Sequence, residues 1–476
     1  MDKQGAMKTA HLIGICGIGM SATALLLKQD GFVVSGSDAD CYGPPKGILD
    51  RANIKPTLTY APANIPEPVD LVVIGRNAKL LPSENDEVRS AYERRLNIRS
   101  FPEVLGDLTK DRSNLVVAGS YGKSTTTSIV AHILRHAGVD AGYFIGAEPI
   151  RSATLPAPSD IGTAPVFVLE GDEYPSGHDD PRAKFMHLHP HDVVLTAVVH
   201  DHVNIYPTYE DYTKPFRDLL AAVPGDGQVV VCAEEPGALK LANESGARVV
   251  TYGVDTGDYH AADIRIGARS RFTLICPDGL SVELETALLG RHNIENIIAA
   301  GTCLLSRKLV DARAFQAAVA DFAGVRRKLD NIALGSAVPV YEGFGSSYEK
   351  ARSAIEAIQL HFSDNRLVVV FEPHTFGWRN RANLYWYDDV FAGADLTWVA
   401  APATQGAATH AQLAGSEILD RVRLSGIAAE PYDPTHPEAV VEALRPGDVV
   451  LILTSGDLNG SLEALSAAVA ERFALG

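Results

Sequence analysis

The chain has 476 residues, more than one hydrophobic core usually holds, so we expect two or three domains. Apolar residues make up 46% of the sequence and charged residues 21%, a balance that excludes a disordered chain. The net charge of -17 argues against non-specific binding to nucleic acid or to an anionic membrane. An acidic protein that handles phosphates must therefore concentrate its positive charge locally.

The cysteines and the first residues bear on the cellular compartment. The cysteines are odd in number and form no CxxC pair, which favours reduced thiols; they are Cys16, Cys41, Cys232, Cys276 and Cys303. No apolar run is long enough to cross a bilayer, and residues 1–6 lack the apolar core of a signal peptide. We therefore expect a cytoplasmic protein, monomeric or homodimeric, that acts on small molecules.

Short apolar runs alternate with helical patterns along the chain, which predicts an α/β protein with parallel sheets built from βαβ units. The predicted strands are residues 12–16, 33–35, 71–74, 115–118, 166–170, 193–199, 229–231, 338–341, 367–371, 396–400 and 449–454. Within residues 264–289, short strand-like segments meet at Pro277-Asp278-Gly279, which predicts a hairpin inserted into the middle domain. Candidate boundaries at 110–113 and 324–331 give three domains.

A glycine-rich turn follows the first predicted strand, in the run HLIGICGIGMS of residues 11–21. Glycines let the backbone approach a diphosphate at a helix N-terminus. The next predicted strand ends at Ser37 and Asp38, where an acidic side chain can meet a ribose or a base. The spacing leaves three alternatives open, which are a dinucleotide site, a nucleotide-sugar site, and a turn without a ligand.

A second glycine turn follows residues 115–118 and opens a helix; it reads Gly119, Ser120, Tyr121, Gly122, Lys123, Ser124 and Thr125. This order is typical of a phosphate-binding loop, in which backbone N–H groups, a lysine and a magnesium-binding hydroxyl surround the anion. The helix N-terminus adds a positive partial charge. The usual loop has a further glycine where this chain has Val117, so a plain strand-turn-helix corner is the alternative.

Acidic and histidine side chains follow the next strands. The strand 166–170 leads into Glu170-Gly171-Asp172-Glu173-Tyr174, and carboxylates at a strand end beside a phosphate loop can hold magnesium. After 193–199 come His200 and His202, which an extended backbone would point the same way, toward a metal or a carboxylate. Solvated loops are the alternative for both. A zinc site at His187, His189 and His191 lacks a fourth ligand at fixed spacing, so we expect polar strand-end residues there.

Two motifs lie near the second boundary. Asn293 and Asn296 share one face of a predicted helix, where paired amides can bind an adenine edge or act as helix caps. Arg326, Arg327 and Lys328 form a cationic hinge that can clamp a phosphoryl group as domains close, with a solvated charge run as the alternative.

Taken in this order, the motifs resemble those of the Mur ligase family from Met7 to the end of the chain. The resemblance implies an N-terminal Rossmann-like UDP-sugar domain (7–110), a central P-loop ATPase-like domain (111–324) and a C-terminal Rossmann-like domain (325–476). The N-terminal motif is similar to the muramate–alanine ligase branch. The run DPRAKFMHLHP of residues 180–190 is more similar to the murein peptide ligase branch, which joins L-Ala-γ-D-Glu-meso-diaminopimelate to UDP-N-acetylmuramate.

The resemblance also implies roles for single residues. The UDP-sugar would be held by Gly17, Ile18, Gly19, Met20, Ser21, Ser37 and Asp38. ATP would lie on the loop 119–125, with Lys123 on its β- and γ-phosphates. Magnesium would be held by Ser124, Glu170 and His202. Adenine would face Asn293 and Asn296, and Arg327 would reach the nucleotide from the third domain.

The implied activity is an ATP- and Mg²⁺-dependent ligase of peptidoglycan synthesis or recycling. It would turn the muramate carboxylate into an acyl phosphate, which an amino acid or peptide amine then attacks, and domain closure would exclude water. The third domain departs from the family's Asp-Asp-aromatic-x-His-His-Pro run, because Gly343 replaces the second carboxylate and Ser346 and Ser347 replace the histidines. The alternatives are a non-catalytic binder of UDP-sugar or cell-wall fragments and a Mur-type ligase with another substrate. A nicotinamide oxidoreductase would leave the phosphate loop unexplained.

Overall fold

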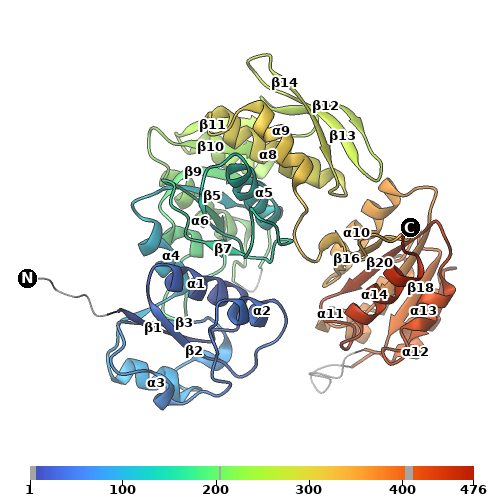
Figure 1. The fold of residues 1–476 in the computed structure, drawn as a ribbon, viewed down its shortest axis with the longest axis horizontal. Coiled ribbons are helices and arrows are strands. Elements are labelled where there is room, and N and C mark those ends of the chain that lie inside the picture. Colours follow the sequence, from blue (N-terminus) through green and yellow to red (C-terminus); the bar gives the residue numbers. More distant parts are fainter. Residues whose placement is uncertain (1–6, 203–204, 403–410, 476) are drawn as a thin grey trace, which may run out of the picture. The chain divides into compact units, whose positions relative to one another are not determined.

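The structure is a computed structural model that describes residues 7–202, 205–402 and 411–475. The chain forms two compact units (Figure 1). The first comprises Met1–Asp263, Phe272–Glu285 and Ile294–Phe322, and the second comprises Ile264–Arg271, Thr286–Asn293 and Ala323–Gly476. None of the helices in the described part of the chain is long and apolar enough to cross a membrane.

The N-terminal part of the first unit is a four-stranded parallel sheet in the order β2-β1-β3-β4. Its strands are β1 (Thr9–Ile13), β2 (Val33–Ser37), β3 (Leu71–Ile74) and β4 (Ile98–Arg99). Its helices are α1 (Ile18–Gln29), α2 (Gly43–Arg51), α3 (Asp86–Glu93) and α4 (Phe101–Thr109). Side chains from α1, α2 and α4 pack on one face of the sheet and those of α3 on the other.

The first predicted strand is wrong in its position along the chain. It was expected at 12–16, whereas β1 ends at Ile13 and the turn already begins at Gly14. Gly14 has φ +83°, and a Cβ there would lie 2.6 Å from Leu80 Cδ1, so the chain must turn at this glycine. Ile15 continues the apolar run in the sequence because it is buried in the core from within the turn.

The middle part of the first unit is a seven-stranded sheet in the order β11-β10-β9-β5-β8-β6-β7. Its strands are β5 (Ser113–Ala118), β6 (Gly142–Phe144), β7 (Ser159–Asp160), β8 (Val166–Gly171), β9 (Pro190–Leu195), β10 (Gln228–Cys232) and β11 (Arg248–Tyr252). Only β7, among the described strands of this sheet, pairs antiparallel. The helices α5 (Lys123–His136), α6 (Tyr209–Ala221) and α7 (Pro236–Glu244) connect the strands.

One hydrophobic cluster joins the two sheets of the first unit, since Ala22, Leu26 and Leu105 of α1 and α4 pack with the side chains of β5, β8 and β9. The central strand β5 lies between β8 and β9, so the ends of all three strands meet at one edge. After β11 the chain continues with β12 (His260–Arg265), β13 (Ser270–Ile275), β14 (Ser281–Thr286), α8 (Arg291–Ser306) and α9 (Ala312–Asp321). The parts of these elements within Ile264–Arg271 and Thr286–Asn293 belong to the second unit. The hairpin predicted at Pro277-Asp278-Gly279 is confirmed, as the turn between β13 and β14.

The second unit holds a six-stranded sheet in the order β15-β16-β20-β17-β18-β19, parallel except for β15. Its strands are β15 (Lys328–Asn331), β16 (Val340–Phe344), β17 (Arg366–Phe371), β18 (Leu396–Ala400), β19 (Ala428–Tyr432) and β20 (Asp448–Thr454). Its helices include α10 (Tyr348–His361), α12 (Gly415–Leu424), α13 (Glu438–Ala443) and α14 (Leu462–Arg472). Two clusters of buried side chains cover its two faces, so the α/β prediction is confirmed here as well.

Candidate active site

The phosphate-type loop connects β5 to α5 and is fixed by close packing. Gly119 has φ +137°, and a Cβ there would lie 2.2 Å from Thr196 Oγ1. Gly122 has φ +80°, and its Cβ would lie 2.7 Å from Asn296 Oδ1. Ser120 N donates to the carbonyl oxygen of Ala197 at 2.9 Å. Both glycines are therefore required by space and by backbone conformation, and α5 presents its N-terminus at the end of the loop.

Lys123 is the first residue of α5, and its side chain is only 15% exposed. Its ammonium donates to Glu173 Oε2 at 2.9 Å and to the carbonyl oxygen of Gly119. Burial opposes its charge, but Glu173 and the neighbouring carboxylates outweigh that effect and raise the pKa of Lys123. The loop therefore carries a fixed positive charge beside its backbone N–H groups.

Ser124 and Glu170 form the next pair in the site. Ser124 Oγ donates to Glu170 Oε1 at 2.9 Å, and Gly146 N donates to Glu170 Oε2 at 2.7 Å. Burial raises the pKa of Glu170 above its ordinary value, and the contacts with Gly146, Lys123 and Ser124 act in the opposite direction. A hydroxyl beside a carboxylate at a phosphate loop is a donor set that suits Mg²⁺, which commonly takes one or two carboxylates and completes its shell with water and phosphate oxygens.

Glu173 joins Lys123 to His202. His202 Nε2 lies 3.5 Å from Glu173 Oε1, and the ring of Tyr174 meets the His202 imidazole edge-on at 5.0 Å. The carboxylate of Glu173 beside the imidazole raises the pKa of His202. No sequence pattern distinguished Glu173 from Glu170 and Asp172, because three carboxylates within four positions do not reveal which one contacts the lysine.

The two histidines after β9 do not face the same way, so that expectation is wrong. His200 Nε2 contacts the carbonyl oxygen of Tyr206 at 2.8 Å, whereas His202 points to Glu173. The predicted strand 193–199 ends at Leu195, and His202 has φ +53°, so the two-residue alternation of a strand does not apply.

The earlier histidines His187 and His191 contact different carboxylates. His187 contacts Asp180 Oδ2 at 2.9 Å, while His191 lies near Asp192 and Asp226. Within residues 7–202, 205–402 and 411–475, no three His, Cys, Asp or Glu side chains are grouped to hold a metal ion. A magnesium ion at Ser124 and Glu170 would therefore depend on ligand oxygens from elsewhere, as is usual for this metal.

The N-terminal glycine turn lies between β1 and α1, with Gly17 as the N-cap of the helix. Gly17 is exposed, Ile18, Gly19 and Asp38 are partly exposed, and the other three predicted sugar-binding residues, Met20, Ser21 and Ser37, are buried. Ser21 Oγ donates to the carbonyl oxygen of Ile18 at 3.0 Å. Ser37 Oγ donates to Glu87 Oε1 at 2.7 Å. The turn therefore offers mainly backbone to a ligand.

Asp38 organises the turn from the end of β2. Its Oδ2 accepts the backbone N–H of Cys16 at 2.8 Å, and its Oδ1 accepts the Tyr60 hydroxyl at 2.9 Å. Burial and the hydrogen bond to Asp38 raise the pKa of Tyr60. Cys16 also forms a disulfide with Cys41, with Cα atoms 5.3 Å apart. The expectation of five reduced thiols is wrong for this pair, and a separation of 25 residues gave no local signal for it.

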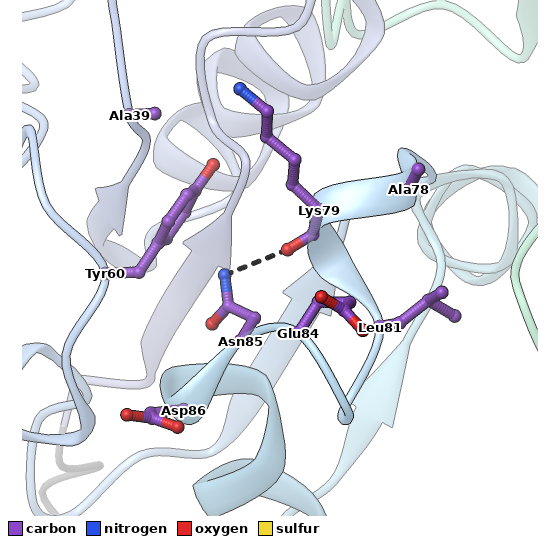
Figure 2. A pocket seen from close by; sticks show the side chains of 8 residues that line it. All are labelled: Ala39, Tyr60, Ala78, Lys79, Leu81, Glu84, Asn85 and Asp86. Atoms are coloured by element: carbon purple, nitrogen blue, oxygen red, sulfur yellow. Dashed lines mark hydrogen bonds between the residues drawn. The ribbon is translucent and has the colours of Figure 1, made fainter.

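A cavity of about 700 Å³ adjoins Asp38 at the same edge of the N-terminal sheet. It is lined by Ala39, Tyr60, Ala78, Lys79, Leu81, Glu84, Asn85 and Asp86. Figure 2 shows Tyr60 and Lys79 on opposite sides of the hollow, and Asn85 Nδ2 donates to the carbonyl oxygen of Lys79 at 3.3 Å. This cavity could not be predicted from the sequence, because its walls come from residues 39, 60 and 78–86, and none of these segments carries a motif.

The asparagines of α8 are both buried but contact different groups. Asn296 Oδ1 accepts from Thr126 Oγ1 at 3.1 Å and supports the phosphate-type loop. Asn293 Nδ2 donates to the carbonyl oxygen of Leu289 at 2.7 Å, as expected of an asparagine in the first turn of a helix. The prediction that the pair faces adenine stays a prediction.

In the second unit, Arg327 is held at the ends of β16 and β20. Its Nε lies 3.0 Å from Glu342 Oε1, its Nη2 donates to the carbonyl oxygen of Gly456 at 2.6 Å, and its guanidinium lies 5.0 Å from the Phe344 ring centroid. Burial raises the pKa of Glu342, with Arg327 acting against that effect. The role of Arg327 toward a nucleotide stays a prediction.

The departures in the third domain have local structural reasons. A Cβ on Gly343 would lie 3.1 Å from Leu453 Cδ2 and near Leu329 and Ala354, so a side chain there would be tightly packed against apolar groups. Ser347 is the N-cap of α10, and its side chain accepts from Lys350 N. These positions therefore serve packing and helix capping in this chain.

Comparisons with known proteins agree with this geometry. Residues 9–113 match the model "Mur ligase family, catalytic domain" and residues 117–304 match "Mur ligase middle domain". The chain is 31% identical to UDP-N-acetylmuramate–L-alanine ligase of Halorhodospira halophila, covering 96% of this chain and 92% of that relative. It is 30% identical to the enzyme of that name from Methylococcus capsulatus, covering 94% of each.

Solved structures are similar over the same length. UDP-N-acetylmuramate-alanine ligase of Thermotoga maritima has a TM-score of 0.78 at 24% identity, covering 98% of this chain and 99% of that one. A murein peptide ligase of Psychrobacter arcticus has a TM-score of 0.69 at 24% identity, covering 99% and 100%. The corresponding ligase of Neisseria meningitides is 29% identical with a TM-score of 0.60, covering 68% of this chain and all of that one.

Proposed function

We propose that this protein joins L-alanine to the carboxylate of UDP-N-acetylmuramate. The premise is that the chain belongs to the Mur ligase family and is an ATP-dependent, ADP-forming amide ligase. The relatives at 30% identity or more carry that activity in their names. The expected preference for the murein peptide ligase branch gains no support from them. A peptide that begins with L-alanine is the second candidate, favoured by the 29% identity to a ligase named for that peptide.

One observation carries the proposal. Two side chains of the phosphate-type loop meet the carboxylates at the end of β8. The contacts are Lys123–Glu173, Ser124–Glu170 and Glu173–His202. This is a site that can bind the tail of a triphosphate, because it combines backbone N–H groups, one buried ammonium and a magnesium-type donor set.

The proposed reaction has two steps. A carboxylate oxygen of the sugar substrate attacks the γ-phosphorus of ATP, and ADP leaves, so that an acyl phosphate forms. The neutral amine then attacks the acyl carbon, loses a proton, and inorganic phosphate leaves as the amide forms. Lys123 would turn from Glu173 to the β- and γ-phosphates and neutralise their charge.

Magnesium fits the residues present. Ser124 and Glu170 would hold one ion and His202 a second, and the metal would neutralise charge on the phosphate oxygens. Glu173 pairs with Lys123 and lies beside His202, the positive groups that the phosphates would need. We infer that Glu173 is the internal counterion that ATP displaces.

The sugar nucleotide would lie along the edge of the N-terminal sheet. Gly17, Ile18 and Gly19 would contact the diphosphate through their backbone, while Asp38 keeps the turn in place. The cavity between Tyr60 and Lys79 would take the uridine end, because it adjoins Asp38 and has room for a ring. Met20, Ser21 and Ser37 would shape this site from below its surface.

The remaining assignments complete the proposal. The domains would divide at residues 110 and 324, with Asn293, Asn296 and Arg327 completing the nucleotide site on closure. The enzyme would act in the cytoplasm, where UDP-sugars and ATP are made, as a monomer or homodimer.

Amine-dependent release of ADP tests this function. The protein is incubated with ATP, Mg²⁺ and UDP-N-acetylmuramate, with L-alanine, with L-Ala-γ-D-Glu-meso-diaminopimelate, or without amine. We expect ADP and a product that is heavier than UDP-N-acetylmuramate by one L-alanine residue. Both should be lost in Lys123→Ala. Release with the peptide alone would assign the second substrate. Tight UDP-sugar binding without ADP release for any amine would favour the non-catalytic binder instead.

A further inference from the structure

Lys184 is a second partly buried lysine beside the site, and the proposed reaction gives it no role so far. It begins the short helix η3 (Lys184–His187), within the run of residues 180–190. Its side chain is 17% exposed, and its ammonium donates to Asp172 Oδ2 at 2.6 Å. The ring centroids of Phe101 and Tyr174 lie 5.3 and 5.7 Å from the nitrogen. The charge is therefore held in place by one carboxylate and two rings.

The position of Lys184 connects the two ligand sites of the first unit. Asp172, its partner, directly precedes Glu173, which holds the loop lysine Lys123 at 2.9 Å. On its other side, Phe101 covers the N-terminal glycine turn, since a Cβ on Gly19 would lie 3.2 Å from Phe101 Cζ. Lys184 thus stands where a sugar nucleotide on the turn and a triphosphate on the loop would approach each other.

This place needs a cation for the chemistry to occur. The donor carboxylate and the γ-phosphoryl group are both anionic, and they must come into contact before the acyl phosphate can form. The protein itself adds three carboxylates here, Glu170, Asp172 and Glu173. Among the residues that the structure describes, Lys184 donates one hydrogen bond, to Asp172, whereas an ammonium has three N–H donors. Two donors are therefore available to an incoming oxygen anion.

We propose that Lys184 binds the lactyl carboxylate of the sugar-nucleotide substrate and holds it for attack on the γ-phosphorus. The inference rests on the proposed function and names the group that recognises the acid. Asp172 fixes the ammonium before substrate arrives and stays its partner afterwards, so that Lys184 bridges a protein carboxylate and the substrate carboxylate.

Two ligands that differ only in the lactyl group test the inference without turnover. UDP-N-acetylmuramate carries the carboxylate, and UDP-N-acetylglucosamine lacks it. Their dissociation constants are measured by calorimetry, without ATP, on the wild type and on Lys184→Met, Lys184→Gln and Lys184→Arg. Lys214→Met is the matched control, because Lys214 is 73% exposed on α6 and pairs with Asp218. Thermal melts establish that each variant is folded.

We expect Lys184→Met and Lys184→Gln to bind UDP-N-acetylmuramate about 10- to 100-fold more weakly, as for a lost charge-assisted hydrogen bond, with UDP-N-acetylglucosamine changed less than about threefold. Lys184→Arg should recover part of the loss, and Lys214→Met should match the wild type. Equal losses for both ligands, or no loss for either, would overturn the role of Lys184. Failure of the ligase function would appear separately, as a wild type that binds the muramate ligand but releases no ADP with any amine.

Discussion

Glu173→Gln is the substitution that most sharply probes the ion pairs of the candidate site. The amide keeps the size of the side chain but removes the charge that pairs with buried Lys123 at 2.9 Å and with His202 at 3.5 Å. A charge-assisted hydrogen bond contributes about 1.5–3 kcal/mol, and the His202 contact is longer than a hydrogen bond, so we expect a loss of about 2 kcal/mol. For a unit as large as the first one, that corresponds to a fall in Tm of about 3 °C.

Differential scanning fluorimetry with and without ATP and Mg²⁺ measures the effect. Because ATP would displace Glu173 from Lys123, the variant should bind ATP within a few-fold of the wild type, and its Tm deficit should shrink when ATP is bound. Glu210→Gln is the control, since Glu210 lies at the surface with Arg217 and should leave the Tm unchanged. An unchanged Tm in ligand-free Glu173→Gln would refute the counterion argument.

The same pair predicts a dependence on pH. Glu173 raises the pKa of His202 above its ordinary value of 6.5, so the ion pair stabilises the fold fully below that value and is lost as pH rises through the raised pKa. The Tm difference between the wild type and Glu173→Gln should therefore be larger near pH 6 than near pH 9, where the contacts of Glu173 with Lys123 and Tyr212 remain. A difference that grows with pH would contradict the assignment.

Three further outcomes are expected. Gly122→Ala should weaken ATP binding by tenfold or more, because Gly122 has φ +80° and a Cβ there would meet Asn296. The control is Gly138→Ala, at φ +84° in open space, which should not affect ATP binding. Equilibrium binding of a fluorescent ATP analogue compares the two variants. Gly343→Asp should destabilise the second unit by about 3 kcal/mol without creating activity, as judged by denaturant unfolding and ADP release. Cys41→Ser should lower stability by about 3 kcal/mol in the absence of reductant and match the reduced wild type, since it removes the bond to Cys16.

Local chemistry allowed much of the site to be predicted from the sequence. In the loop 119–125, positive φ angles and close packing require glycine at positions 119 and 122. The lysine and the serine of the loop belong to the same sequence motif. Glu170 was expected beside the loop because it ends a strand there, and it contacts Ser124. His202, which the family resemblance placed at the metal, lies 3.5 Å from Glu173. The metal-binding roles of Glu170 and His202 stay predictions.

Other features depend on tertiary packing that the sequence does not display. The apolar run continues through Ile15 although β1 ends at Ile13, because the side chain of Ile15 is buried while its backbone lies in a turn. The sequence therefore did not reveal where the strand ends. The Cys16–Cys41 bond joins two loops that only the sheet brings together. Gly343 stands where the family run has its second carboxylate, and the apolar neighbours that would meet a side chain there lie far away in the sequence or in other elements. Spacing alone could not distinguish Glu173 from its acidic neighbours.

The most direct test of the account follows an oxygen atom. UDP-N-acetylmuramate labelled with ¹⁸O in its lactyl carboxylate is incubated with the protein, ATP, Mg²⁺ and the amine that supports turnover, and the released phosphate is examined by mass spectrometry. Formation of an acyl phosphate on the loop that begins at Gly119 predicts one carboxylate oxygen in each phosphate released. Phosphate released without the label, while the amide forms, would contradict the account.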